Sequence, residues 1–149
     1  MPWLHSAHFG RLAYAPSSTL TFSEGLPGFD EEHGFLLIEQ PCHHPLVFLQ
    51  SVITPNLCFP ALPVRVIEPQ YQPQLTGADL QLLAFEEQPK IGEDAVVLIL
   101  VAVHEQNPTA NLLAPVVINL RTRAAAQCID PGMRYSHRHA LLPVLEPAS

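Results

Sequence analysis

Residues 95–103 read Ala-Val-Val-Leu-Ile-Leu-Val-Ala-Val, the longest apolar run in the chain. Apolar and polar side chains do not alternate in this run, which is rich in valine, isoleucine and leucine. Successive side chains of a strand point to opposite faces of a sheet, so a strand of this kind is covered on both faces. We therefore predict a central strand at Ala95–His104. The run is also far shorter than the ~20 apolar residues that a membrane-spanning helix needs.

Shorter apolar runs on both sides of this segment are bounded by proline, glycine and asparagine, a pattern typical of strands joined by turns. The other strands that we predict are Phe9–Tyr14, Thr19–Phe22, Phe35–Glu39, Leu46–Val52, Leu57–Phe59, Val64–Glu68, Val116–Leu120 and Ala124–Ile129. One short helix is predicted after Thr76, a good capping residue, because Leu80, Leu83 and Ala84 follow at helical spacing. Sixteen prolines disfavour longer helices. We expect a mostly β fold, an antiparallel barrel-like or folded-over sheet, as a single domain over residues 1–149.

The chain has 14 acidic and 7 basic residues, and its net charge is −7. Acidic residues gather in two places, listed here in chain order: Glu24, Asp30, Glu31 and Glu32, then Glu86, Glu87, Glu93 and Asp94. Contacts to phosphate backbones need lysine and arginine, so direct nucleic-acid binding is disfavoured. A basic protein partner is favoured instead, because an acidic surface attracts it.

Three cysteines at wide spacing (Cys42, Cys58 and Cys128) form neither a CxxC motif nor a disulfide framework, which indicates reduced thiols in a cytoplasmic protein. The first 15 residues lack the apolar core of a secretory signal. No HExxH, GxSxG, phosphate-binding loop or GxGxxG motif is present, so we expect no catalytic residue, no metal and no cofactor. One alternative remains open: a small β-barrel hydrolase or metal enzyme that uses Cys58 or a histidine cluster, with a deep pocket and strongly shifted pKa values.

Two segments stand out for their local chemistry. Gly25-Leu26-Pro27-Gly28 predicts a type II turn, because proline presets φ at one central residue and glycine accepts the positive φ of the next. In Thr109–Pro115, the side chains of Thr109 and Asn111 can form hydrogen bonds with nearby backbone groups. Pro115 restricts the residue before it to an extended conformation. Asn119 then ends an apolar strand, where it either satisfies a neighbouring backbone group or marks an exposed strand edge.

Together these segments resemble the flagellar assembly factor FliW family. The matching segments, in order, are Leu20–Asp30, Phe48–Ser51, Pro69–Tyr71, Thr109–Asn119, and Tyr135 followed by Arg138 and His139. The resemblance extends from about His8 to Leu142, nearly the whole chain. Gln70 departs from the aspartate usual in the third segment, which puts one possible acidic contact in doubt.

The resemblance implies a barrel-like β fold and a binding protein without catalysis. FliW proteins bind flagellin in the cytoplasm, and they also bind the translational repressor CsrA and relieve its repression of flagellin mRNA. We expect the same partners here, with no direct nucleic acid and no membrane. Two alternatives are a chaperone-like flagellin binder without CsrA binding, and a β scaffold for an unrelated protein.

On this hypothesis the candidate residues form two groups. The partner-binding candidates are Glu24, Asp30, Glu31, Glu32, Asn111, Leu112 and Asn119. The residues expected to support the fold of the motifs are Gly25, Pro27, Gly28, Phe29, Gln50, Tyr71, Thr109 and Pro115, with Phe48 and Leu49 in the core or beside a turn.

Overall fold

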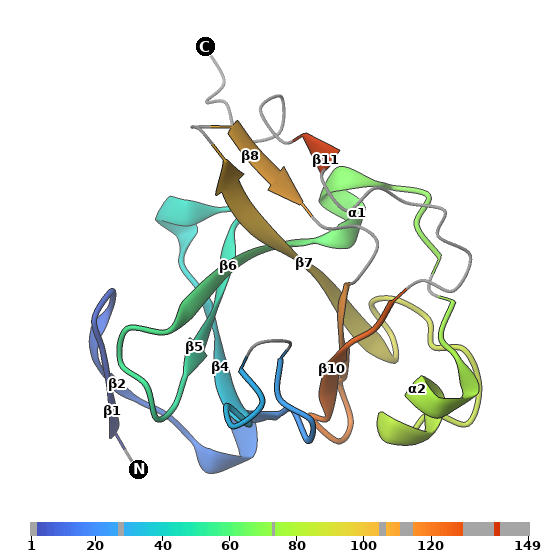
Figure 1. Cartoon of the computed structure of the whole chain (residues 1–149), viewed down its shortest axis with the longest axis horizontal. Coiled ribbons are helices and arrows are strands. Elements are labelled where there is room, and N and C mark those ends of the chain that lie inside the picture. Colours follow the sequence, from blue (N-terminus) through green and yellow to red (C-terminus); the bar gives the residue numbers. More distant parts are fainter. Residues whose placement is uncertain are drawn as a thin grey trace.

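A computed structural model gives the structure of the protein, and it describes residues 3–26, 29–72, 74–104, 107–110, 115–129 and 139–140 (Figure 1). The strands are β1 (Trp3–Ser6), β2 (Gly10–Ala13), β3 (Leu20–Thr21), β4 (Gly34–Glu39), β5 (Val47–Ser51), β6 (Cys58–Pro63), β7 (Ala95–His104), β8 (Asn107–Ala110), β9 (Val116–Asn119), β10 (Ala125–Gln127) and β11 (His139–Ala140). The helices are α1 (Val64–Ile67) and α2 (Gly77–Leu82), with 3₁₀ turns η1 (Pro16–Ser18) and η2 (Pro41–His43). No helix among these residues is long and apolar enough to cross a membrane.

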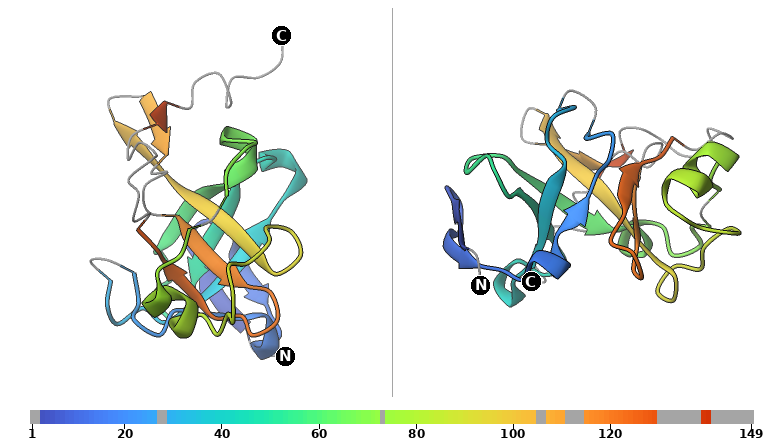
Figure 2. Two further views of the ribbon diagram at one scale, coloured as in Figure 1. Left: turned by 90° about the vertical axis from the view of Figure 1, so that its right-hand side faces the viewer. Right: turned by 90° about the horizontal axis from the view of Figure 1, so that it is seen from below.

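One antiparallel sheet curls into a nearly closed barrel. Its strands follow the order β10-β9-β7-β6-β5-β4-β3. The first and last strands meet where the N–H of Thr21 donates to the carbonyl of Arg123 at 2.9 Å, and Thr21 forms a bridge with Ala124. The β1–β2 hairpin and α2 lie outside the barrel on opposite sides (Figures 1 and 2). The predicted fold class is confirmed.

The strand β7 is the central strand that the apolar run predicts, and it is covered on both faces. On one face Val96 and Leu98 point into the barrel, where they join a cluster built from every strand of the sheet path. On the other face Val97 and Ile99 belong to a second cluster, which covers the outside of the barrel. The inner cluster contains Leu20, Phe22, Leu26, Phe35, Val47, Leu49, Ala61, Leu98, Val116, Ile118 and Ala125. The barrel is therefore a packed core with a second core on its outer face.

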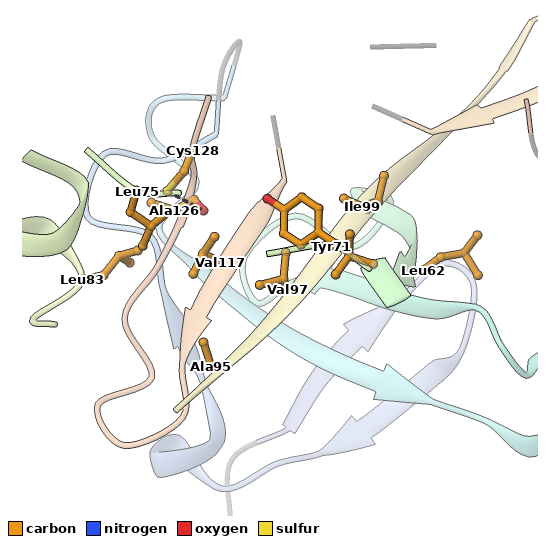
Figure 3. Close-up of a cluster of buried hydrophobic side chains, with 11 residues drawn as sticks. Leu62, Tyr71, Leu75, Leu83, Ala95, Val97, Ile99, Val117, Ala126 and Cys128 are labelled. Atoms are coloured by element: carbon orange, nitrogen blue, oxygen red, sulfur yellow. Dashed lines mark hydrogen bonds between the residues drawn. The ribbon is translucent and has the colours of Figure 1, made fainter. Parts of the chain in front are cut away.

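The outer core is sealed by α1, α2 and the chain between them (Figure 3). The predicted helix forms as α2, and the Thr76 hydroxyl caps it by accepting the N–H of Asp79 at 3.1 Å. Leu83 follows the helix and is completely buried in the outer cluster. A pair of hydrogen bonds between the Gln88 side chain and the backbone of Leu75 fixes this cover.

The strand predicted at Val64–Glu68 is wrong, because the chain forms the helical turn α1 there. Val64 is buried, Val66 is 40% exposed and Ile67 packs on the outer cluster. A strand would place Val64 and Val66 on the same face, whereas helical spacing places Val64 with Ile67. The need to cover the outer core therefore overrides the β-branched composition of this segment.

Three strands, β1, β8 and β11, are absent from the predicted set, and β6 runs beyond the predicted Leu57–Phe59 through Pro60. The N–H of Ser51 donates to the carbonyl of Leu57, so Pro60, opposite Phe48, occupies a position that needs no hydrogen bond to β5. Pairing of β6 with β7 begins only at Ala61. Pro60 is therefore tolerated because its missing N–H faces the side without a strand partner.

We expect Leu98→Ala to lower the free energy of unfolding by about 2–5 kcal/mol, because Leu98 is buried in the inner cluster and its removal leaves a cavity. The measurement is urea unfolding followed by circular dichroism. Val66→Ala, at an exposed site on α1, is the control and should change stability by less than about 0.5–1 kcal/mol. Equal losses in the two variants would contradict this assignment of the core.

Candidate functional site

The segment between β3 and β4 is a tight excursion that closes one end of the barrel. The N–H of Phe29 donates to the carbonyl of Leu26 at 2.7 Å, and the N–H of Phe22 donates to that of His33 at 2.8 Å. Gly25 has a φ of +67°, and a Cβ there would lie 2.6 Å from the carbonyl oxygen of Phe29. Only glycine fits this position. The predicted type II turn at Pro27 and Gly28 lies outside the described residues.

The four acidic candidates on this segment fall into two kinds. Glu24, Asp30 and Glu31 are exposed, as a contact to a charged partner requires. Glu32 is half-buried, and its carboxylate accepts hydrogen bonds from the hydroxyls of Ser51, at 2.7 Å, and Thr54. Glu32 therefore holds the turn that follows β5 against the segment that precedes β4.

Gln50 is the centre of a buried polar network beside this contact. Its side-chain carbonyl accepts the hydroxyl of Ser6 at 2.7 Å, and its amide donates to the carbonyl of Ser51 at 3.0 Å. The same amide lies 3.3 Å from the carbonyl of Thr54. Gln50 is completely buried, and no buried side-chain nitrogen or oxygen among the described residues lacks a partner. The network ties the N-terminal hairpin, β5 and the following turn into one unit.

A row of aromatic rings runs from the barrel interior to this end. Phe22 and Phe35 are buried, with ring centroids 5.2 Å apart, and Phe35 leads to Phe59 at 6.0 Å. Phe29 meets Phe59 edge to face at 5.4 Å, yet 40% of Phe29 is exposed. Phe29 therefore both supports the turn and presents apolar surface to solvent.

Four more of the predicted support residues, Tyr71, Leu49, Phe48 and Pro115, are buried or partly buried. Tyr71 is 2% exposed in the outer cluster (Figure 3), and Leu49 is completely buried inside the barrel. Phe48 is half-buried against Phe9, with ring centroids 5.2 Å apart. The carbonyl of the buried Pro115 accepts the N–H of Cys128 at 2.8 Å.

The block that ends at Asn119 is described in part. Asn111 and Leu112 lie outside the described residues, and Thr109 lies in β8, opposite Ala102 of β7. Asn119 is 3% exposed; its amide donates to the carbonyl of Leu83 at 2.8 Å, and its side-chain oxygen accepts the N–H of Arg121. Of the two alternatives for Asn119, the structure shows the one in which it satisfies backbone groups.

The second acidic run comes together around an open hollow of about 660 Å³ between the end of α2 and the β9–β10 turn. Its acidic lining residues are Glu86, Glu87, Glu93 and Asp94, and Asn119 and Arg121 also line it. The sequence shows these acidic residues. It does not show that Glu86 and Glu87 face the same hollow as Glu93 and Asp94, which follow six to eight positions later. Asn119 shapes this hollow, because it joins the chain after α2 to β9.

Among the described residues, a hollow of about 380 Å³ is lined by His8, His43 and Cys58 together with aromatic side chains, as the enzyme alternative requires. Burial raises the pKa of the Cys58 thiol, which disfavours the nucleophilic thiolate. Among the described residues, no group of three or more His, Cys, Asp or Glu side chains could hold a metal ion.

Comparison with known proteins gives a consistent result. The family model described as FliW protein matches residues 4–141. The flagellar assembly factor FliW of Bdellovibrio bacteriovorus is 35% identical over 129 residues, which cover 85% of this chain and 71% of that protein. The FliW of Caldanaerobacter subterraneus is 32% identical over 146 residues, covering 97% and 96%. A crystal structure of the flagellar assembly factor FliW superposes with a TM-score of 0.82 at 29% identity, covering 94% of this chain and 96% of that one.

We expect Gly25→Ala to destabilise the protein by more than about 1–3 kcal/mol, because it combines positive φ with a backbone clash. Gly10→Ala is the matched control, since Gly10 also has positive φ but a Cβ at this position would meet no atom within 4 Å. Thermal unfolding of both variants measures the difference. A Gly25→Ala variant no less stable than Gly10→Ala would show that the close contact at Gly25 is not rigid.

Burial raises the pKa of the Cys128 thiol to about 12, with a smaller contribution from the charge of Asp79. The unfolded thiol titrates near 9, so the folded state binds more protons between pH 9 and 12. Cys128 therefore contributes stability that is complete below pH 9 and is lost as the pH rises toward 12.

Urea unfolding of the wild type and Cys128→Ala at pH 8, 9 and 10 tests this pH dependence. Stability should fall more steeply above pH 9 in the wild type, by up to roughly 1.4 kcal/mol per pH unit. Identical pH profiles for the two proteins would contradict the assigned shift.

Proposed function

The chain belongs to the FliW family of flagellar assembly factors, and we propose that it binds flagellin and the translational repressor CsrA in the cytoplasm. Binding to flagellin and binding to CsrA exclude one another, so free flagellin controls how much CsrA is sequestered. The protein acts by binding, without catalysis. Repression of flagellin mRNA translation is relieved while CsrA is held.

The observation that carries this proposal is the exposed acidic surface of the segment before β4. A repressor that binds RNA contacts phosphates, and lysine and arginine supply those contacts. A protein of net charge −7 with exposed Asp30 and Glu31 is complementary to such a partner. The same charge opposes direct contact with RNA, which supports action through the repressor.

Charge reversal tests the electrostatic part of this proposal. We expect Asp30→Lys combined with Glu31→Lys to slow association with CsrA by about tenfold at low salt and to flatten its salt dependence. Glu32 is left unchanged, because its reversal would also break the hydrogen bonds to Ser51 and Thr54. Stopped-flow or surface-based association kinetics over a salt series are the measurement.

Glu86→Lys combined with Glu87→Lys is the matched control, since it changes the net charge equally at the hollow beside α2. Slower association in the Asp30 and Glu31 variant alone supports the assignment. Equal slowing in both variants means that net charge, and not this surface, steers the partner. Slowing only in the control variant would move the contact to the hollow.

A further inference from the structure

The two turns joined by Glu32 carry an unusual combination of exposed apolar and acidic side chains. Glu32 bonds the hydroxyls of Ser51 and Thr54, and Ile53 lies between those two residues. The N–H of Ile53 itself lies 3.2 Å from the Ser51 hydroxyl, and the N–H of Glu32 donates to the carbonyl of Phe29 at 3.0 Å. Residues 29–32 and 51–54 are therefore one connected surface at the end of the barrel.

This surface exposes two large apolar side chains to solvent. Ile53 is 69% exposed and Phe29 is 40% exposed, although Phe29 rests on Phe59 through one edge. Large apolar groups exposed on turns that are held together in this way are typical of contact sites. The close backbone contact at Gly25 holds the first turn, and the hydrogen bonds from the Gln50 amide to the carbonyls of Ser51 and Thr54 hold the second. The two turns therefore keep these side chains exposed.

The two segments that form this surface carry charge of one sign. Asp30 and Glu31 are exposed next to Phe29, and neither residues 19–32 nor residues 46–57 contain a lysine or an arginine. A second copy of this chain would bring the same acidic groups to the contact, and like charges repel across an interface. The complementary occupant is a basic one.

We propose that residues 29–32 and 51–54 form a docking surface for a basic amphipathic segment of the partner protein, in which lysine or arginine flanks a large apolar side chain. Phe29 and Ile53 contact the apolar side chain, and Asp30 and Glu31 contact the basic groups. Glu32 is a positioning residue: its carboxylate is used in joining the two turns. This inference rests on the proposed function, because it names the surface through which the chain binds CsrA.

The test compares two substitutions of the same type at exposed isoleucines. Ile53→Ala removes an apolar contact from the proposed surface, and Ile129→Ala removes one at a 64% exposed site after β10. Both variants should keep wild-type stability. We expect Ile53→Ala to weaken binding to CsrA at least tenfold and Ile129→Ala to leave it unchanged, in calorimetric titrations of the full chain.

Thr54→Val tests the positioning role of Glu32 without changing the charge of the protein. It removes the Thr54 hydroxyl from the carboxylate, so the two turns should separate more readily. We expect faster dissociation of the complex, with the salt dependence of association unchanged because Asp30 and Glu31 remain. An altered salt dependence with unchanged dissociation would overturn this role and make Glu32 a direct contact.

The outcomes separate the two proposals. If the wild type binds neither partner, the proposed function fails and the docking surface fails with it. If the wild type binds and Ile53→Ala binds as tightly as Ile129→Ala, the docking surface is wrong while the proposed function stands. Loss of CsrA binding in Ile53→Ala alone supports the surface. Loss of flagellin binding with CsrA binding unchanged would overturn the assignment of CsrA to it.

Discussion

The structure depends on one strand that must be buried on both faces. Alternate side chains of β7 enter the barrel core and the outer core, so the two cores share this strand. The inner face requires the sheet to curl around it, and the bridge from Thr21 to Ala124 completes that curl. The outer face requires a cover, which α1, α2 and the segment around Tyr71 provide. Together these demands fix the architecture more strongly than the propensity of any single segment.

The two cores hold the barrel together, so the segment before β4 and the turn after β5 can carry polar and exposed side chains. There, Gly25 allows the segment before β4 to pass close to its own backbone, and Gln50 satisfies the buried groups that the turn after β5 leaves. Glu32 then joins the two segments. The motifs that resemble the FliW family thus contain residues that set the shape of a surface as well as residues exposed on it, such as Asp30.

The sequence predicts the parts of the fold that periodicity governs. The central strand, the helix after Thr76 and the antiparallel barrel-like class all follow from local patterns, and all are confirmed. The strand prediction at Val64 fails, because the demand for a cover over the outer core is not visible locally. The link from Glu32 to Ser51 is equally hidden, since it joins side chains 19 residues apart through tertiary packing. The acidic residues are evident from the sequence, but which of them are exposed and which are used internally is not.

The proposed mutual exclusion of flagellin and CsrA can be tested directly. The most direct measurement is a calorimetric competition, in which flagellin is titrated into a preformed complex of this protein with CsrA. We predict displacement of CsrA in proportion to the flagellin added, with an apparent affinity for flagellin that weakens as the CsrA concentration rises. Simultaneous binding of both partners, or binding of neither, would contradict mutual exclusion.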